Sequence, residues 1–134
     1  MIRREPCIAC PYRKDAPPGL WAASEYDKLL PYDATTSEQP FEAFACHATP
    51  EHLCHGWAVV HSNRGHEFEL ISLRLAAALR RLDGIEIPEP LVPLFGSAAE
   101  AAEHGKSAID DPPEEAFVMG ERLARKYGRL RKEL

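Results

Sequence analysis

Residues 7–11 read CIACP and residues 46–57 read CHATPEHLCHGW, and these two stretches hold all the cysteines of the 134-residue chain. The cysteines are Cys7, Cys10, Cys46 and Cys54. In a reducing compartment an even set of thiols points to a bound metal more often than to disulfides. The two stretches therefore predict a metal centre that joins distant parts of the chain.

The composition favours a cytoplasmic protein. The first residues carry no apolar stretch of the kind that opens a secretory leader, and no run approaches the roughly 18 apolar residues of a membrane span. Cytoplasmic thiols stay reduced, which supports the metal interpretation. If the chain were secreted instead, two disulfides would be the competing interpretation.

The pattern of prolines and apolar residues predicts a mainly α-helical single domain over residues 1–134. Prolines at positions 6, 11, 17 and 18 rule out a regular element near the start of the chain. We expect an irregular, proline-rich, metal-binding half, residues 1–62, packed on a half of three to four helices, residues 63–134. Residues 41–46 and 57–61 could add one short β-hairpin.

The clearest helix is predicted over residues 67–83, because apolar side chains recur there at three- and four-residue steps and Gly84 follows as a C-cap. We expect this helix to form the core. Shorter helices are predicted over 24–30, capped by Ser24, and over 97–105, capped by Ser97.

A last helix should begin with Pro112 at its first position. Its inward side chains are predicted to be Phe117, Leu123, Ala124, Tyr127 and Leu130. The basic side chains near its end are Arg122, Arg125, Lys126, Arg129, Arg131 and Lys132. They complement a helix dipole, which is the simpler interpretation, although nucleic acid or an acidic partner is an alternative.

The cysteine spacing leaves the metal open between a [4Fe–4S] cluster and one zinc ion. Cys7 and Cys10 have the two-residue separation common to both kinds of site, whereas the long gap to Cys46 and Cys54 is irregular for a zinc ribbon. A proline after a ligand cysteine recurs in cluster-binding loops. Three histidines could replace a thiolate or lie behind one: His47, His52 and His55. The aromatic residues expected to shield the centre are Tyr12, Trp21, Phe44 and Trp57.

Residues 7–13, CIACPYR, and residues 19–25, GLWAASE, resemble the core of the WhiB-like regulators of actinobacteria and their phages. That family carries Cys-x-x-Cys-Pro-Val-Arg and a Gly-[Val/Ile]-Trp-Gly-Gly turn, binds a [4Fe–4S] cluster and contacts a sigma factor. The resemblance implies that Cys7 and Cys10 are cluster ligands and that Gly19 to Trp21 form the adjacent turn. The family's next cysteine falls at Ala16 here, so Cys46 and Cys54 would complete the set.

Over nearly its whole length the chain is similar to an uncharacterised family of small actinobacterial and phage proteins. Their pattern is Cys-x-x-Cys-Pro-aromatic-Arg, a Gly-x-Trp turn, Cys-His and Cys-x-Gly-Trp, the last two seen here at residues 46–47 and 54–57. This resemblance implies four cysteine ligands and no particular activity.

The function predicted from the sequence is a non-enzymatic, regulatory metalloprotein with a [4Fe–4S] cluster and a protein partner. A structural zinc module is the first alternative. A small metal-dependent enzyme is the third, and it would need an open coordination position. No catalytic residue is predicted.

Overall fold

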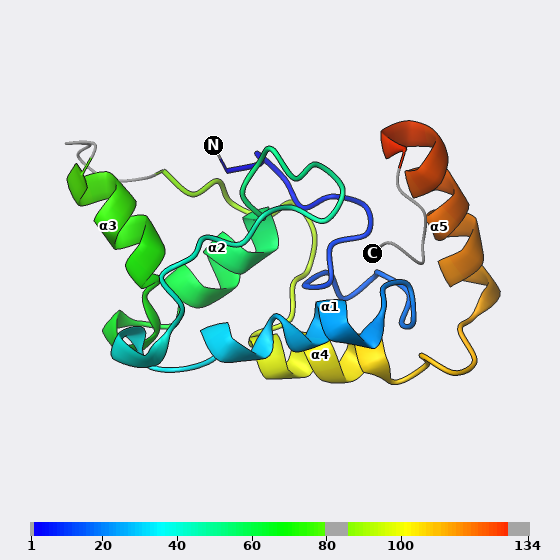
Figure 1. Cartoon of the computed structure of the whole chain (residues 1–134), viewed down its shortest axis with the longest axis horizontal. Coiled ribbons are helices and arrows are strands. Elements are labelled where there is room, and N and C mark those ends of the chain that lie inside the picture. Colours follow the sequence, from blue (N-terminus) through cyan, green and yellow to red (C-terminus); the bar gives the residue numbers. More distant parts are fainter. Residues whose placement is uncertain (1, 80–85, 129–134) are drawn as a thin grey trace.

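The computed structural model describes residues 2–79 and 86–128, and within them the chain is mainly helical, as predicted (Figure 1). The α-helices are α1 (Ala23–Asp27), α2 (His55–Ser62), α3 (Ile71–Leu79), α4 (Ala98–Lys106) and α5 (Glu114–Tyr127). Short 3-10 turns lie at Leu30–Tyr32, Thr36–Glu38 and His66–Phe68. None of the helices in the described part of the chain is long and apolar enough to cross a membrane.

The helix at the centre of the core is α2. Seven of its eight residues, His55 to His61, are buried, and Trp57 is completely inaccessible to solvent. The prediction of a strand over 57–61 is therefore wrong. Val59 and Val60 favour strands, but the sulfur of Cys54 accepts the Trp57 N–H at 3.4 Å and caps a helix that is packed on all sides.

The predicted core helix, 67–83, begins later and is more peripheral than expected. It is observed as α3, preceded by the turn at His66–Phe68, and lies at one end of the molecule (Figure 1). Leu70 and Leu73 are buried, whereas Leu75 is 43% exposed. Residues 80–85, which include the predicted C-cap Gly84, lie outside the described residues.

Helices α1 and α4 pack side by side (Figure 1), so a helix from residues 1–62 contacts a helix from residues 63–134. Ser97 caps α4 as predicted, since its hydroxyl accepts the N–H of Glu100 at 3.1 Å. The predicted cap of α1 is wrong, because Ser24 lies inside the helix and Ala22 occupies the cap position without a side-chain bond.

Helix α5 packs through one narrow face at the edge of the molecule (Figure 1). It begins at Glu114 after Pro113, two residues later than predicted. Leu123 is buried as expected, but Phe117 is 49% exposed, so the predicted inward face is partly wrong. The helix ends at the left-handed Gly128, and the predicted inward Leu130 lies outside the described residues.

The loop that carries two of the cysteines is closed by a short antiparallel pairing. The Cys46 N–H donates to the His52 carbonyl and the Cys54 N–H to the Phe44 carbonyl, both at 2.8 Å. Residues 44–46 thus pair with 52–54, and the expected hairpin between 41–46 and 57–61 does not form. The described residues contain isolated bridges only, including one between Ile2 and Leu53.

Candidate metal centre

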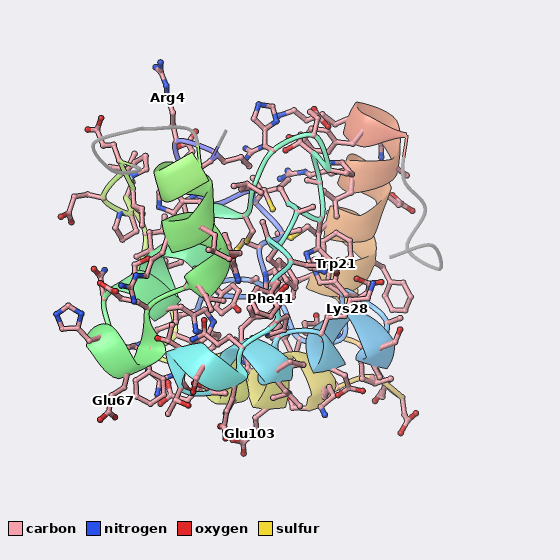
Figure 2. The ribbon with its side chains drawn as sticks, turned by 60° about the vertical axis from the view of Figure 1, so that its left-hand side comes forward. Arg4, Trp21, Lys28, Phe41, Glu67 and Glu103 are labelled. Atoms are coloured by element: carbon pink, nitrogen blue, oxygen red, sulfur yellow. The ribbon has the colours of Figure 1, made fainter. Side chains whose placement is uncertain are left out.

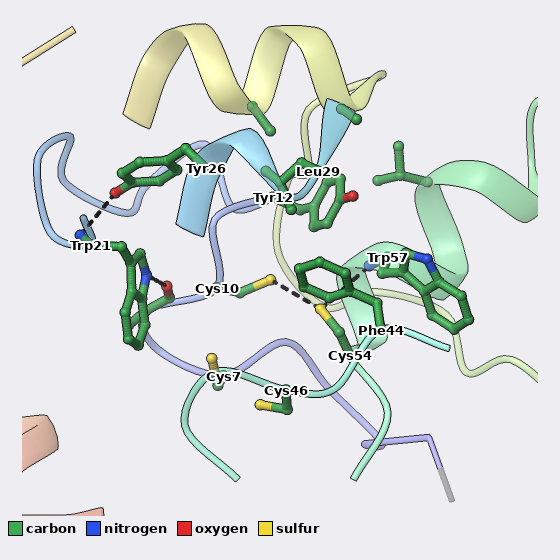
Figure 3. Close-up of a cluster of buried hydrophobic side chains, with 14 of the residues drawn as sticks. Cys7, Cys10, Tyr12, Trp21, Tyr26, Leu29, Phe44, Cys46, Cys54 and Trp57 are labelled. Carbon is green, nitrogen blue, oxygen red and sulfur yellow. Dashed lines mark hydrogen bonds between the residues drawn. The ribbon is translucent and has the colours of Figure 1, made fainter. Parts of the chain in front are cut away.

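The four cysteines from both ends of the N-terminal half meet in one buried cluster (Figure 3). None forms a disulfide, and each is at most 4% exposed. The sulfurs of Cys10 and Cys54 lie 4.0 Å apart. Cys7 and Cys46 form the second pair in Figure 3, and the Cys7 thiol interacts with both Cys10 and Cys46. The fold therefore arranges the thiols as two adjoining pairs.

Local backbone turns hold the first pair of ligand candidates in place. The Cys10 N–H donates to the Cys7 carbonyl at 3.0 Å, which closes the turn between them. The indole N–H of Trp21 donates to the Ala9 carbonyl at 2.8 Å, so the ring is fixed against this turn (Figure 3). Gly19 has φ +73°, a conformation that favours glycine, and it begins the bend that delivers Trp21.

The Trp57 N–H donates to the Cys54 sulfur at 3.4 Å, and backbone N–H groups two or three residues further along the chain act to lower the pKa of the other three cysteines. The pairs are Ala9 with Cys7, Tyr12 with Cys10, Thr49 with Cys46 and Trp57 with Cys54. An N–H group donated to sulfur favours the thiolate over the thiol. These N–H groups suit sulfurs that bind a cation, and a purely structural apolar cysteine does not require them.

Crowding opposes that charge when no cation is present. The neighbouring Cys10 thiol, followed by burial, raises the pKa of Cys7 to about 12. Cys54 and burial raise the pKa of Cys10 well above its ordinary value, and Cys7 and burial raise that of Cys46. Several thiolates cannot share this site alone, whereas a bound cation would favour all of them.

The thiols do not form a ready-made single-ion site. Across residues 2–79 and 86–128, no three cysteine, histidine, aspartate or glutamate side chains converge tightly enough to hold one metal ion. The donor chemistry of four buried sulfurs nevertheless fits iron or zinc, both of which bind thiolates. Any bound group would have to join the two pairs.

The three histidines predicted as substitute ligands have other contacts. Nδ1 of His55 lies 2.9 Å from the carbonyl oxygen of Arg3, and Nε2 of His47 lies 3.2 Å from a Glu25 carboxylate oxygen. His47 also packs between Trp21 and Phe44, with ring centroids at 4.7 and 5.4 Å. His52 is partly exposed beside Glu51. These contacts suit residues that support the thiols and do not themselves bind the metal.

The four predicted shielding residues, Tyr12, Trp21, Phe44 and Trp57, are all buried around the thiols (Figure 3). A cleft of about 500 Å³ approaches the centre from one side, and it is lined by Cys46, His47, Glu25, Tyr32 and Phe44 among others. Cys46 is thus one of the residues that line this cleft, although it is itself buried.

Sequence reasoning missed several residues that contact the cluster. Gly56 packs so closely that a methyl group there would lie 2.8 Å from the Cys10 sulfur. The Arg3 side chain donates to the Thr49 hydroxyl oxygen at 2.9 Å, and Thr49 opposes the rise in the pKa of Cys46. The Cys-x-Gly-Trp pattern could have indicated Gly56, because a close approach of neighbouring atoms is a reason for glycine. Nothing in the local sequence signals Arg3 or Thr49.

Three of the six predicted basic residues lie on the described part of α5. Arg122, Arg125 and Lys126 are exposed, and Arg125 lies 3.5 Å from Glu121. The other three, Arg129, Arg131 and Lys132, lie outside the described residues. A nucleic-acid contact through this helix stays a prediction.

Comparison with known proteins places the chain in a family. Residues 2–126 match the model of a family of unknown function, DUF6283. The chain belongs to this family. No curated protein and no solved structure matches it. Family membership thus carries no activity with it, and the local similarity to the WhiB-like regulators stays a prediction.

Proposed function

We propose that this member of DUF6283 is a non-enzymatic metalloprotein in which Cys7, Cys10, Cys46 and Cys54 hold an iron–sulfur cluster. The observation that carries the proposal is the gathering of all four sulfurs in one buried cluster, with a backbone N–H group that favours the thiolate or bonds to the sulfur at each. Apolar packing would not require a polar partner at every sulfur, whereas thiolate ligation benefits from each of them.

The pairing of the thiols favours a cluster over a single ion. In a [4Fe–4S] cluster each cysteine binds a different iron, so the ligands need not converge on one point. The described side chains show no three-fold convergence on one point, which agrees with this requirement. The packing of Trp21 and Phe44 over the thiols would limit access of water and oxygen. When bound, such a cluster would supply a one-electron redox centre.

A structural zinc ion is the second candidate, and one distance favours it. Sulfurs around a tetrahedral zinc lie about 3.8 Å apart, given Zn–S bonds near 2.3 Å. The Cys10 and Cys54 sulfurs are 4.0 Å apart. In that case the two pairs would close on one ion, which would act as a folding staple.

The proposed role is regulatory, with a protein as the partner and the cytoplasm as the compartment. A centre that joins the Cys7–Cys10 turn to the Cys46–Cys54 loop would order both segments only when loaded. A partner protein would bind the surfaces of these segments, including the cleft lined by Cys46, when the metal is present and both segments are ordered. The similarity of residues 7–13 and 19–25 to WhiB-like regulators supports this role.

The deciding experiment is purification without oxygen, followed by an absorption spectrum and analysis of iron, sulfide and zinc. We expect a brown protein with about four irons per chain. Each of the four Cys→Ser variants should lose the metal, whereas His52→Gln should keep it. A colourless protein with one zinc would establish the zinc staple instead. A wild-type chain that holds no metal, even after reconstitution with iron and sulfide or with zinc, would overturn the proposal.

A further inference from the structure

The cleft beside the candidate metal centre is lined by two segments of the chain. Glu25, Lys28 and Tyr32 belong to α1 and the turn after it, and most of the other lining residues lie in the range 40–50. The volume of the cleft, about 500 Å³, is within the range of sites that bind another molecule. Of the four candidate ligands only Cys46 lines it, so most of this surface has no role in the proposed metal centre.

Two exposed apolar residues adjoin the cleft. Phe41 is 71% exposed (Figure 2) and lies between the lining residues Pro40 and Glu42. Leu30 is 40% exposed and precedes the lining residue Pro31. Exposed apolar side chains that gather at one place mark surfaces that bind a partner. The prolines restrict the backbone beside both residues, so less freedom is lost when a partner binds.

Three of the buried residues that line the cleft carry rings. Tyr32 and Phe44 meet edge to face, with ring centroids 5.6 Å apart. The ring of His47 lies 5.4 Å from that of Phe44. Aromatic rings favour such edge-to-face and tilted contacts at about 4.5–7 Å. A phenyl ring that entered the cleft would therefore extend an aromatic cluster that is already in place.

The lining residues carry charges of both signs that a partner can reach. Lys28 binds a Glu25 carboxylate oxygen at 2.7 Å, but its side chain is 59% exposed and its ammonium group has protons for a second carboxylate. Glu42, from the other segment, is exposed and forms no ion pair within the described part of the chain. A surface with a cation in one segment and a carboxylate in the other can be complementary to itself under a two-fold rotation.

We infer that the cleft binds a second copy of this chain, in a two-fold dimer in which Phe41 of each copy enters the cleft of the other. Phe41 and Glu42 together present a ring and a carboxylate, which match the rings and the Lys28 cation of the cleft. Lys28 of one copy then meets Glu42 of the other, and the same contact occurs twice. The inference goes beyond the proposed function, because it concerns the outer surface of the loop and holds whatever the thiols bind. A different protein that binds this cleft would compete with the second copy.

Sedimentation velocity of the full chain in reducing buffer, over a range of protein concentrations, would measure the association. We expect the wild type to dimerise and Phe41→Ser to weaken the dimer by about tenfold or more, as for an aromatic anchor at the centre of an interface. Leu91→Ser is the matched control and should dimerise like the wild type, because Leu91 is 79% exposed and does not line the cleft. A wild-type chain that stays monomeric at every concentration would overturn the inference and leave the cleft to a different protein.

Two charge variants test the two-fold contact directly. Lys28→Glu places two carboxylates at each contact between the copies and Glu42→Lys places two ammonium groups there, so each variant alone should dimerise about tenfold more weakly than the wild type, or less. Mixed in equal amounts, the two variants should associate again, because both contacts of the mixed dimer join opposite charges. A mixture that associates no better than either variant alone would overturn the inference, as would a Phe41→Ser protein that dimerises like Leu91→Ser.

Discussion

The hydroxyl oxygen of Tyr12 lies 3.1 Å from Nε2 of His61, and both side chains are completely buried. The rings meet edge to face at 5.9 Å. Tyr12 follows the Cys7–Cys10 turn, and His61 lies in the last turn of α2. This one hydrogen bond therefore joins the cysteine-bearing turn to the core helix.

Tyr12→Phe should lower the free energy of unfolding by about 1–3 kcal/mol, because it leaves a buried imidazole without its partner. Chemical denaturation of wild-type and variant protein would measure the loss. Tyr32→Phe is the control, since the Tyr32 hydroxyl donates at 2.7 Å to a Glu42 carbonyl that water can reach instead. If both variants lowered the free energy of unfolding equally, the Tyr12–His61 hydrogen bond would contribute no more than the exposed one.

The stability of the protein should fall as the pH is lowered from about 6.5 to about 4. Burial lowers the pKa of His61 from 6.5 to about 4. Between these values the unfolded chain binds a proton at this position and the folded chain does not, so acid favours unfolding. The difference corresponds to roughly 3 kcal/mol, fully present above pH 6.5 and lost near pH 4.

Unfolding midpoints measured across this pH range would reveal the histidine contribution as the difference between wild type and His61→Gln. We expect His61→Gln to have a shallower pH dependence. His66→Gln should leave the dependence unchanged, because the His66 side chain is 95% exposed. Parallel curves for wild type and His61→Gln would contradict the assignment.

Gly56→Ala should destabilise the protein by about 1–3 kcal/mol and speed the loss of its metal. The added methyl group would lie 2.7 Å from Cβ of Tyr12 and 2.8 Å from the Cys10 sulfur, so one of them must move. Alanine favours helices over glycine, yet the clash outweighs that gain of about 1 kcal/mol. Thermal unfolding and chelator release would record both effects.

Gly96→Ala provides the matched control for this substitution, because the nearest atom to the new methyl group is Glu100 Oε2 at 3.8 Å. It should leave stability and metal retention near wild type. A Gly56→Ala protein that is more stable than wild type would show that α2 can shift away from the thiols.

Gly105→Ala should separate α1 from α4. A Cβ at residue 105 would overlap the ring of Tyr26, and the Tyr26 hydroxyl is held by the Trp21 N–H at 3.2 Å, so the ring cannot simply swing away. We expect a loss of about 1–3 kcal/mol in unfolding free energy, typical of overpacking. Glu103→Ala on the same helix, where the side chain points into solvent (Figure 2), should change little.

Much of the fold class was predictable because it depends on local rules. Prolines exclude regular structure wherever the chain lies, which accounts for the irregular backbone of residues 2–20. The cap of α4 was also predictable, since Ser97 bonds to a residue only three positions away. The helix over 71–79 lies within the segment that apolar periodicity predicted, although its start and its place in the fold were not predictable in this way.

The core helix escaped prediction because its surroundings, and not its residues, make it helical. Val59 and Val60 favour a strand, and α2 has too few polar residues to show a helical stripe. Burial on all sides and the cap from Cys54 decide the outcome. Helix α3 shows the opposite case, with a clear stripe that meets only part of the core.

The sequence by itself determined that four cysteines stand in a proline-rich, aromatic first half with helices after it, because residue identity and short spacings are local properties. Only the tertiary structure decided that Cys10 lies 4.0 Å from Cys54, and that Arg3 reaches Thr49 across 46 positions of the chain. Such contacts depend on how separate segments pack against one another, and packing is a property of the whole chain that no short pattern contains.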